Sequence, residues 1–142
     1  MPNIHFVGYI EHSDLPAYFK IASAFLHLST EETEGLAVLE ALAASTPVIV
    51  RDIPVYEGWL ADRVNCRKIP SMKSSACSAD DSILITKNCK ISNDELREIE
   101  KIIESTINSD TTGQVKAGHD VAFSRRLSAM GEKLIKLYQR LD

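Results

Sequence analysis

Two glutamates separated by seven residues are the side chains of this sequence best placed for chemistry. Glu32 and Glu40 stand on either side of Gly35 within Ser29–Ala44, STEETEGLAVLEALAA. Glu40 is the only polar residue among the nine helix-forming residues that follow the glycine. A carboxylate on an apolar helix costs folding free energy unless it is hydrogen-bonded or paired. We therefore expect Glu40 to have a partner, which a bound ligand would provide.

The glycine turn between the glutamates indicates a phosphate site. At the start of the predicted helix, the N–H groups of Gly35, Leu36 and Ala37 lack intrahelical partners, and the helix dipole adds roughly half a positive charge. Glu40 lies about 7.5 Å further along the axis, where a carboxylate could accept both hydroxyls of a ribose. Glu32, on the preceding loop, could bind the hydroxyls of a sugar. Together these residues predict a nucleotide-sugar site.

The elements that would position this site alternate along the chain. The predicted strands are Ile4–Val7, Ala24–Leu28, Pro47–Val50 and Cys66–Ile69. The predicted helices are Ser13–Ser23, a helix from Gly35, a short turn within Ile53–Leu60, Asn93–Ile107, a weaker stretch around Gly113 and Gly118, and Ser124–Leu141. Uniformly apolar strands separated by helices predict an α/β fold. We expect a partial Rossmann-like parallel sheet of three to four strands, flanked by helices, with a helical C-terminal tail.

Two parts of this prediction are more specific. In the first helix, Ser13 is the predicted N-cap, and Tyr18 belongs to an apolar stripe with Leu15, Phe19 and Ala22. Residues 71–81 are small and polar and predict an exposed loop, whereas residues 82–86 fit either a helix or a strand.

Length and charge exclude several classes of protein. The 142 residues correspond to a single domain. The formal net charge of −4 gives no basic field for nucleic acid. No apolar run approaches the roughly 20 residues of a membrane span, and residues 1–12 lack the features of a secretory signal. We expect a cytoplasmic protein.

Cysteines and histidines give no sign of a metal or disulfide framework. Cys66, Cys77 and Cys89 are odd in number and lack CxxC spacing, which is typical of free thiols in a reducing compartment. The histidines share no metal-ligand spacing, so no metal site is predicted.

The glutamate spacing resembles a known family signature. Glu32-x7-Glu40, with Gly35 between the glutamates and a strand start at Pro47-Val48, resembles the E-x7-E signature of retaining GT-B glycosyltransferases that use nucleotide-diphosphate sugars. The order HFVGYI, helix, AFLHLS, glutamate motif and TPVIVRDIPVYEGWL is also similar, over roughly residues 3–69. The amino-acid sequence of these segments is most similar to that of bacterial enzymes that glycosylate diacylglycerol.

This resemblance implies a role for each site residue. Glu32 would be the catalytic-site carboxylate that contacts the donor sugar, and Glu40 would bind the nucleotide ribose. The main chain of Gly35, Leu36 and Ala37 would hold the diphosphate. The implied reaction is retaining transfer of a hexose from UDP-hexose or a similar donor to an acceptor, a glycolipid, without a cofactor or a metal.

The resemblance also implies that much of the family's architecture is absent. Members have two Rossmann-like domains, with acceptor groups and a basic phosphate-binding pair on segments that this sequence does not contain. Residues 1–142 are similar to the second half of the C-terminal nucleotide-sugar-binding domain, and the N-terminal acceptor domain is missing. We expect this hexosyltransferase-like chain to be inactive alone and to require the missing domain or a partner chain. The alternative is a non-catalytic remnant or subunit that binds nucleotide sugar or a partner domain.

Association and a membrane contact are further expectations. A sheet edge without its first strands invites pairing, so we predict a homodimer. The basic final helix could contact anionic lipid, which would place the protein at the inner face of the membrane, although a solvated outer face explains the same charges.

The remaining candidates have simpler interpretations. His27 is predicted to be a core or rim histidine, and Tyr56 and Trp59 to pack on the sheet rather than stack on a base. Glu40 could instead pair with Arg51 or Lys20. Glu57 is a second-tier candidate, for which a solvated turn acid is the simpler interpretation. Glu34 stands where the family often has phenylalanine, so it would weaken phosphate binding unless it points to solvent.

Overall fold

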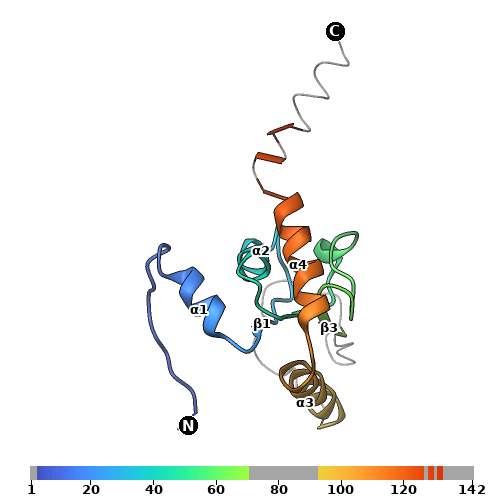
Figure 1. The fold of residues 1–142 in the computed structure, drawn as a ribbon. Helices are drawn as coiled ribbons and strands as arrows, with labels where there is room; N and C mark the ends of the chain where they lie inside the picture. Colours follow the sequence, from blue (N-terminus) through green and yellow to red (C-terminus); the bar gives the residue numbers. More distant parts are fainter. Residues whose placement is uncertain (1–2, 71–92, 127, 130, 133–142) are drawn as a thin grey trace, which may run out of the picture.

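The computed structural model describes residues 3–70, 93–126, 128–129 and 131–132, and within them the chain has an α/β fold (Figure 1). A three-stranded sheet runs in the order β1 (Phe25–His27), β2 (Val48–Arg51) and β3 (Arg67–Ile69). Both strand pairs are parallel, with Leu26 opposite Ile49 and Ile49 opposite Arg67. The predicted partial parallel sheet is confirmed.

The central strand is buried on both faces. Val48, Ile49 and Val50 have no exposed surface. Such a strand needs no alternation of polar and apolar residues, which explains why its sequence is a continuous apolar run. Arg51 is the first half-exposed residue, and it marks the carboxyl edge of the sheet.

The helices surround this strand. They are α1 (Leu15–Ile21), α2 (Leu36–Ala43), α3 (Asn93–Asn108) and α4 (Thr112–Ser124), together with a 3-10 turn, η1 (Pro54–Tyr56). α2 packs on β1 and β2, α1 and α4 pack on α2, and α3 packs beside β3 (Figure 1). α4 approaches α2 closely at Gly118, where an added Cβ would lie 2.6 Å from Leu42 Cδ2. Glycine is required there because the two helices leave no room for a side chain.

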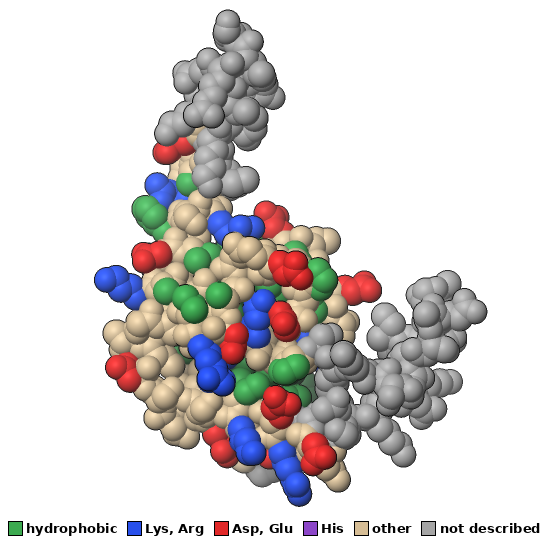
Figure 2. Space-filling view, turned by 90° about the vertical axis from the view of Figure 1, so that its right-hand side faces the viewer, with side chains coloured by type: hydrophobic (Ala, Val, Ile, Leu, Met, Phe, Trp, Pro, Cys, Tyr) green, Lys and Arg blue, Asp and Glu red, His purple; other side chains and the backbone are tan. Residues whose placement is uncertain are grey.

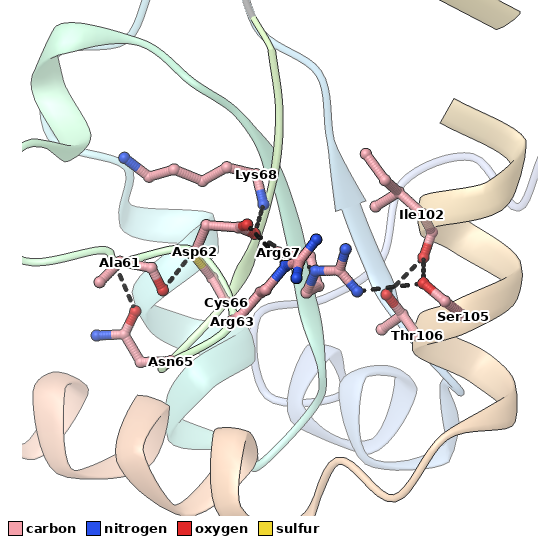
Figure 3. A network of polar contacts seen from close by, with 10 residues as sticks. All are labelled: Ala61, Asp62, Arg63, Asn65, Cys66, Arg67, Lys68, Ile102, Ser105 and Thr106. Atoms are coloured by element: carbon pink, nitrogen blue, oxygen red, sulfur yellow. Dashed lines mark hydrogen bonds and ion pairs between the residues drawn. The ribbon is translucent and has the colours of Figure 1, made fainter. Parts of the chain in front are cut away.

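Polar contacts fasten β3 at the far edge of the sheet (Figure 3). Asp62 Oδ1 accepts hydrogen bonds from the Lys68 main-chain N–H at 2.8 Å and from Arg67 Nε at 3.3 Å. Arg67 Nη1 also donates to Ser105 Oγ on α3 at 3.1 Å. These bonds connect the turn before β3, the strand itself and α3. Basic and acidic side chains are interspersed on the face shown in Figure 2.

The predicted strand Ile4–Val7 is wrong. These residues form no strand, and Phe6 and Val7 are 96% and 60% exposed. A strand is stable only when a neighbour satisfies its backbone groups, and the described residues provide none beside this segment. Figure 1 shows it running away from the sheet.

Helix boundaries differ in smaller ways. α1 begins at Leu15 with Asp14 rather than Ser13 at the N-cap position, and Tyr18 is 45% exposed instead of belonging to a buried stripe. Ser124 ends α4 rather than starting the last helix, because Arg125 and Arg126 leave the helical conformation. Most of the predicted final helix, and the predictions for residues 71–86, fall outside the described residues.

Candidate functional site

The site is built where β1 and β2 end and the loop after β1 enters α2. Gly35 is the residue before α2, in the left-handed conformation with φ 73° and ψ 42°. An added Cβ there would lie 2.9 Å from Tyr56 Cε1 and 3.5 Å from Trp59. Glycine is therefore required at this turn both by the backbone angle and by the aromatic rings beneath it.

Glu32 is held in place from two sides. Its Oε2 lies 3.0 Å from His27 Nε2, and its Oε1 accepts a hydrogen bond from the Thr33 N–H at 3.1 Å. The hydrogen bond with His27 lowers the pKa of the Glu32 carboxyl, and the N–H groups of Thr33 and Gly35 add to this effect. About a quarter of each side chain stays exposed, at 23% for His27 and 25% for Glu32. Glu32 is thus an oriented, ionised carboxylate with a side open to a ligand.

The start of α2 is partly open to solvent. Leu36 is 62% exposed, so the first turn of the helix faces solvent. Glu34 is exposed to solvent.

Glu40 lies further along α2 and faces α1. Its side chain is 39% exposed, with Oε1 3.9 Å from His12 Nε2. It lines a pocket of about 260 Å³ between α1 and α2. Glu40 is only partly buried, because α2 turns only Val38, Ala41 and Leu42 fully into the core.

Neither predicted ion-pair partner binds Glu40. Arg51 Nε instead donates to the Leu28 carbonyl at 3.2 Å. Lys20 lines the same pocket as Glu40, but no ion pair joins them in the described part of the chain. The site thus has two parts: Glu32 and Gly35 lie together at the sheet edge, and Glu40 opens onto the pocket beside α1.

Three residues near the sheet edge were not predicted as site residues. His27 orients Glu32, Arg51 brings a half-buried cation beside the end of β1, and Tyr56 lies beneath Gly35. The parallel pairing of His27 with Val50 brings the first two to one edge. The common position of His27 and Arg51 depends on strand register, which cannot be read from a single sequence.

Tyr56 and Trp59 pack as the simpler interpretation predicted. Tyr56 is completely buried, and its ring meets Trp59 edge to face at a centroid distance of 5.5 Å. Trp59 Nε1 donates to the Val55 carbonyl at 2.7 Å, and Arg125 stacks 4.6 Å from the Trp59 ring centroid. Glu57 is exposed, in agreement with a solvated turn acid.

The thiol of Cys66 lies in the core. Cys66 is buried and unpaired, and burial raises the pKa of its thiol to about 12. Within residues 3–70 and the described part of 93–132, no three His, Cys, Asp or Glu side chains are grouped to hold a metal ion. No helix in the same residues has the length and hydropathy needed to cross a membrane.

Sequence comparison places this chain in a family. Residues 1–99 match the glycosyl transferases group 1 family, and the chain belongs to it. The chain is 30% identical over 139 residues to the processive diacylglycerol alpha-glucosyltransferase of Acholeplasma laidlawii, covering 98% of this chain and 35% of the relative.

Two shorter matches involve related enzymes. Over 62 residues, or 44% of this chain, it is 42% identical to the alpha-monoglucosyldiacylglycerol synthase of Acholeplasma laidlawii, covering 16% of that protein. It is 39% identical over 62 residues to the synthase of the same name from Streptococcus pneumoniae, again 44% of this chain, covering 14% of that protein. The chain thus spans about a third or less of the length of these relatives. No solved structure matches significantly.

Proposed function

We propose that this chain is the donor-binding part of a retaining hexosyltransferase that transfers a hexose from a nucleotide-diphosphate sugar to a glycolipid acceptor. The observation that carries the proposal is the oriented Glu32 carboxylate, which His27 and Thr33 hold beside the left-handed turn at Gly35. The names of the three relatives support a diacylglycerol-based acceptor.

In this proposal each part of the site has one task. Glu32 binds donor-sugar hydroxyls, since an ionised carboxylate is a strong hydrogen-bond acceptor. The N–H groups of Leu36 and Ala37, and that of Gly35 once it leaves the Glu32 carboxylate, bind the diphosphate, where charge builds up as the sugar leaves. Glu40 accepts the ribose hydroxyls from the pocket beside α1. Positioning and charge stabilisation are the protein's contribution, and no metal or cofactor is invoked.

We also propose that residues 1–142 form the second half of the donor-binding domain and act with an N-terminal acceptor domain. The chain matches no more than 35% of the length of each of these relatives, which supports this division. One helix N-terminus stabilises a departing diphosphate less well than a helix together with added cations. The same coverage favours the second candidate function, a non-catalytic subunit that binds nucleotide sugar.

Calorimetry with UDP and UDP-hexoses tests donor binding. We expect the wild-type chain to bind both ligands. Glu40→Ala should lower the affinity about tenfold or more, because the variant loses a hydrogen bond to a charged group. Glu57→Ala is the matched control, because Glu57 is an exposed acid outside the proposed site. Weak binding that Glu40→Ala leaves unchanged would refute the donor site.

A transfer assay separates the two candidate functions. We expect no turnover when the purified chain is incubated with labelled sugar nucleotides and diacylglycerol. Turnover by this chain alone would show that the opposing domain is dispensable. If the chain binds the donor but no sugar is transferred even when the N-terminal domain is supplied, the non-catalytic subunit is favoured.

A further inference from the structure

Tyr56 carries a hydroxyl group that the described structure leaves without a partner. The residue has no exposed surface, and its Oη atom is buried with no hydrogen bond in the described part of the chain. Buried polar atoms nearly always have a partner, so such an exception calls for a specific explanation. Packing accounts for the ring but not for the hydroxyl.

The position of this hydroxyl is informative. Tyr56 Cε1 lies 2.9 Å from the place where a Cβ on Gly35 would stand, and the hydroxyl is bonded to the adjacent ring carbon. The Oη atom therefore lies beside Gly35, the residue before α2. The N-terminus of this eight-residue helix and the buried hydroxyl are two independent features at one place.

The hydroxyl is also held in its protonated, donating form. Burial, with the charge of Glu32 as a second cause, raises the pKa of Tyr56 to about 12. A protonated phenol beside a helix N-terminus offers a hydrogen bond in the same region as the main-chain N–H groups. The missing partner is therefore best explained as an acceptor, and an anion at the helix N-terminus supplies one.

We propose that the Tyr56 hydroxyl is a hydrogen-bond donor to the diphosphate of the bound nucleotide sugar, next to the N–H groups of Gly35, Leu36 and Ala37. This inference rests on the proposed function and adds a side-chain donor to it. The phosphate reaches the hydroxyl when Thr33 and Glu34 of the loop before Gly35 shift outward while Glu32 keeps its contact with His27. Thr30, Glu31, Thr33 and Glu34 in that loop are exposed, so few packing contacts oppose the shift.

The variant Tyr56→Phe separates this role from packing. It keeps the ring beneath Gly35 and removes only the buried hydroxyl. We expect its unfolding temperature to equal or exceed that of the wild type, because an unpaired buried polar group is removed. We expect its affinity for UDP and for inorganic pyrophosphate to fall about tenfold, as when one hydrogen bond to a charged group is lost.

Tyr18→Phe is the matched control, because Tyr18 is 45% exposed on α1, and its UDP affinity should equal that of the wild type. If Tyr56→Phe binds UDP as tightly as the wild type, the inference is wrong and the proposed function stands. If the wild-type chain binds neither UDP nor pyrophosphate, both fail.

A second measurement leaves Tyr56 in place. With 3-fluorotyrosine incorporated throughout the chain, the fluorine resonance of residue 56 should shift when UDP is added. Comparison with labelled Tyr56→Phe and Tyr18→Phe identifies the resonances. A signal of residue 56 that stays fixed while calorimetry shows UDP binding would overturn the inference.

Discussion

At the scale of single residues, the site depends on how each carboxylate is surrounded. Glu32 and Glu40 are identical side chains, yet Glu32 is fixed by two hydrogen bonds, whereas among the described residues Glu40 has only His12 at 3.9 Å. A contact of that length with an exposed partner adds little stability. Glu32 is therefore preorganised by the fold, whereas Glu40 stays available to a ligand.

The pKa of Glu32 gives a prediction at this scale. We expect His27→Ala to raise the pKa of Glu32 towards its ordinary value of 4.5, because the hydrogen bond with His27 is the largest cause of its lowering. A carboxyl whose pKa is lowered by folding stabilises the folded state above its ordinary pKa, and this contribution is lost as the pH falls through the folded-state pKa. The variant should thus lose less stability than the wild type as the pH falls below 4.5.

Carboxyl-carbon NMR titration of Glu32 measures the first effect, and urea unfolding at several acidic pH values measures the second. His12→Ala serves as the control, since His12 is 86% exposed and pairs with Glu40 instead. A Glu32 titration that is the same in His27→Ala as in the wild type would contradict the assigned hydrogen bond.

At the scale of elements, the turn into α2 is the most constrained part of the site. Gly35 and Gly58 both have positive φ, at 73° and 78°. Only Gly35 has rings within contact distance of an added Cβ, whereas nothing lies within 4 Å of that position at Gly58. Substitutions at the two glycines therefore separate the loss of stability due to the backbone angle from the loss due to the close contact.

We expect Gly58→Ala to reduce the free energy of unfolding by about 1–2 kcal/mol, the cost of a left-handed conformation. Gly35→Ala should cost about 1–3 kcal/mol more, because the new methyl group also displaces the Tyr56 ring. Denaturant unfolding of the two variants measures the difference. Equal losses would show that the aromatic contact adds nothing to the requirement for glycine.

At the scale of the whole molecule, the sheet formed by the described residues has an open edge at β1. In the described residues β1 has a neighbour only in β2, and Leu26 within it is 43% exposed. Ile4, Phe6, Val7 and Tyr9 add exposed apolar surface on the preceding segment. Unpaired strand edges and exposed apolar surface both favour association, which is the physical basis for the proposed partner domain and for the predicted homodimer.

We expect the isolated chain to self-associate as its concentration rises in sedimentation equilibrium. Phe6→Ser should weaken that association about tenfold or more, because Phe6 would bury a large apolar side chain in the interface. Phe123→Ser is the control, since Phe123 is 59% exposed on α4. A strictly monomeric wild-type chain at high concentration would refute the prediction.

The sequence by itself determined the α/β class, the parallel sheet, the turn at Gly35 and the order of the elements from α1 to α4. These follow from local properties: β2 is a continuous apolar run, glycine adopts positive φ, and α3 repeats its apolar residues at helical spacing. The predicted strand at Ile4–Val7 failed because a strand also needs a neighbour, which an apolar run does not reveal.

Only the tertiary structure decided how the site residues meet. It brought His27 to Glu32, and it placed Arg51 at the same sheet edge and the Tyr56 hydroxyl beneath Gly35. It also separated Glu40 from the core and turned it towards α1. The physical reason is that the position of Arg51 depends on strand register and that of Glu40 on the rotation of α2 about its axis. Both are set by the packing of residues far apart in the sequence.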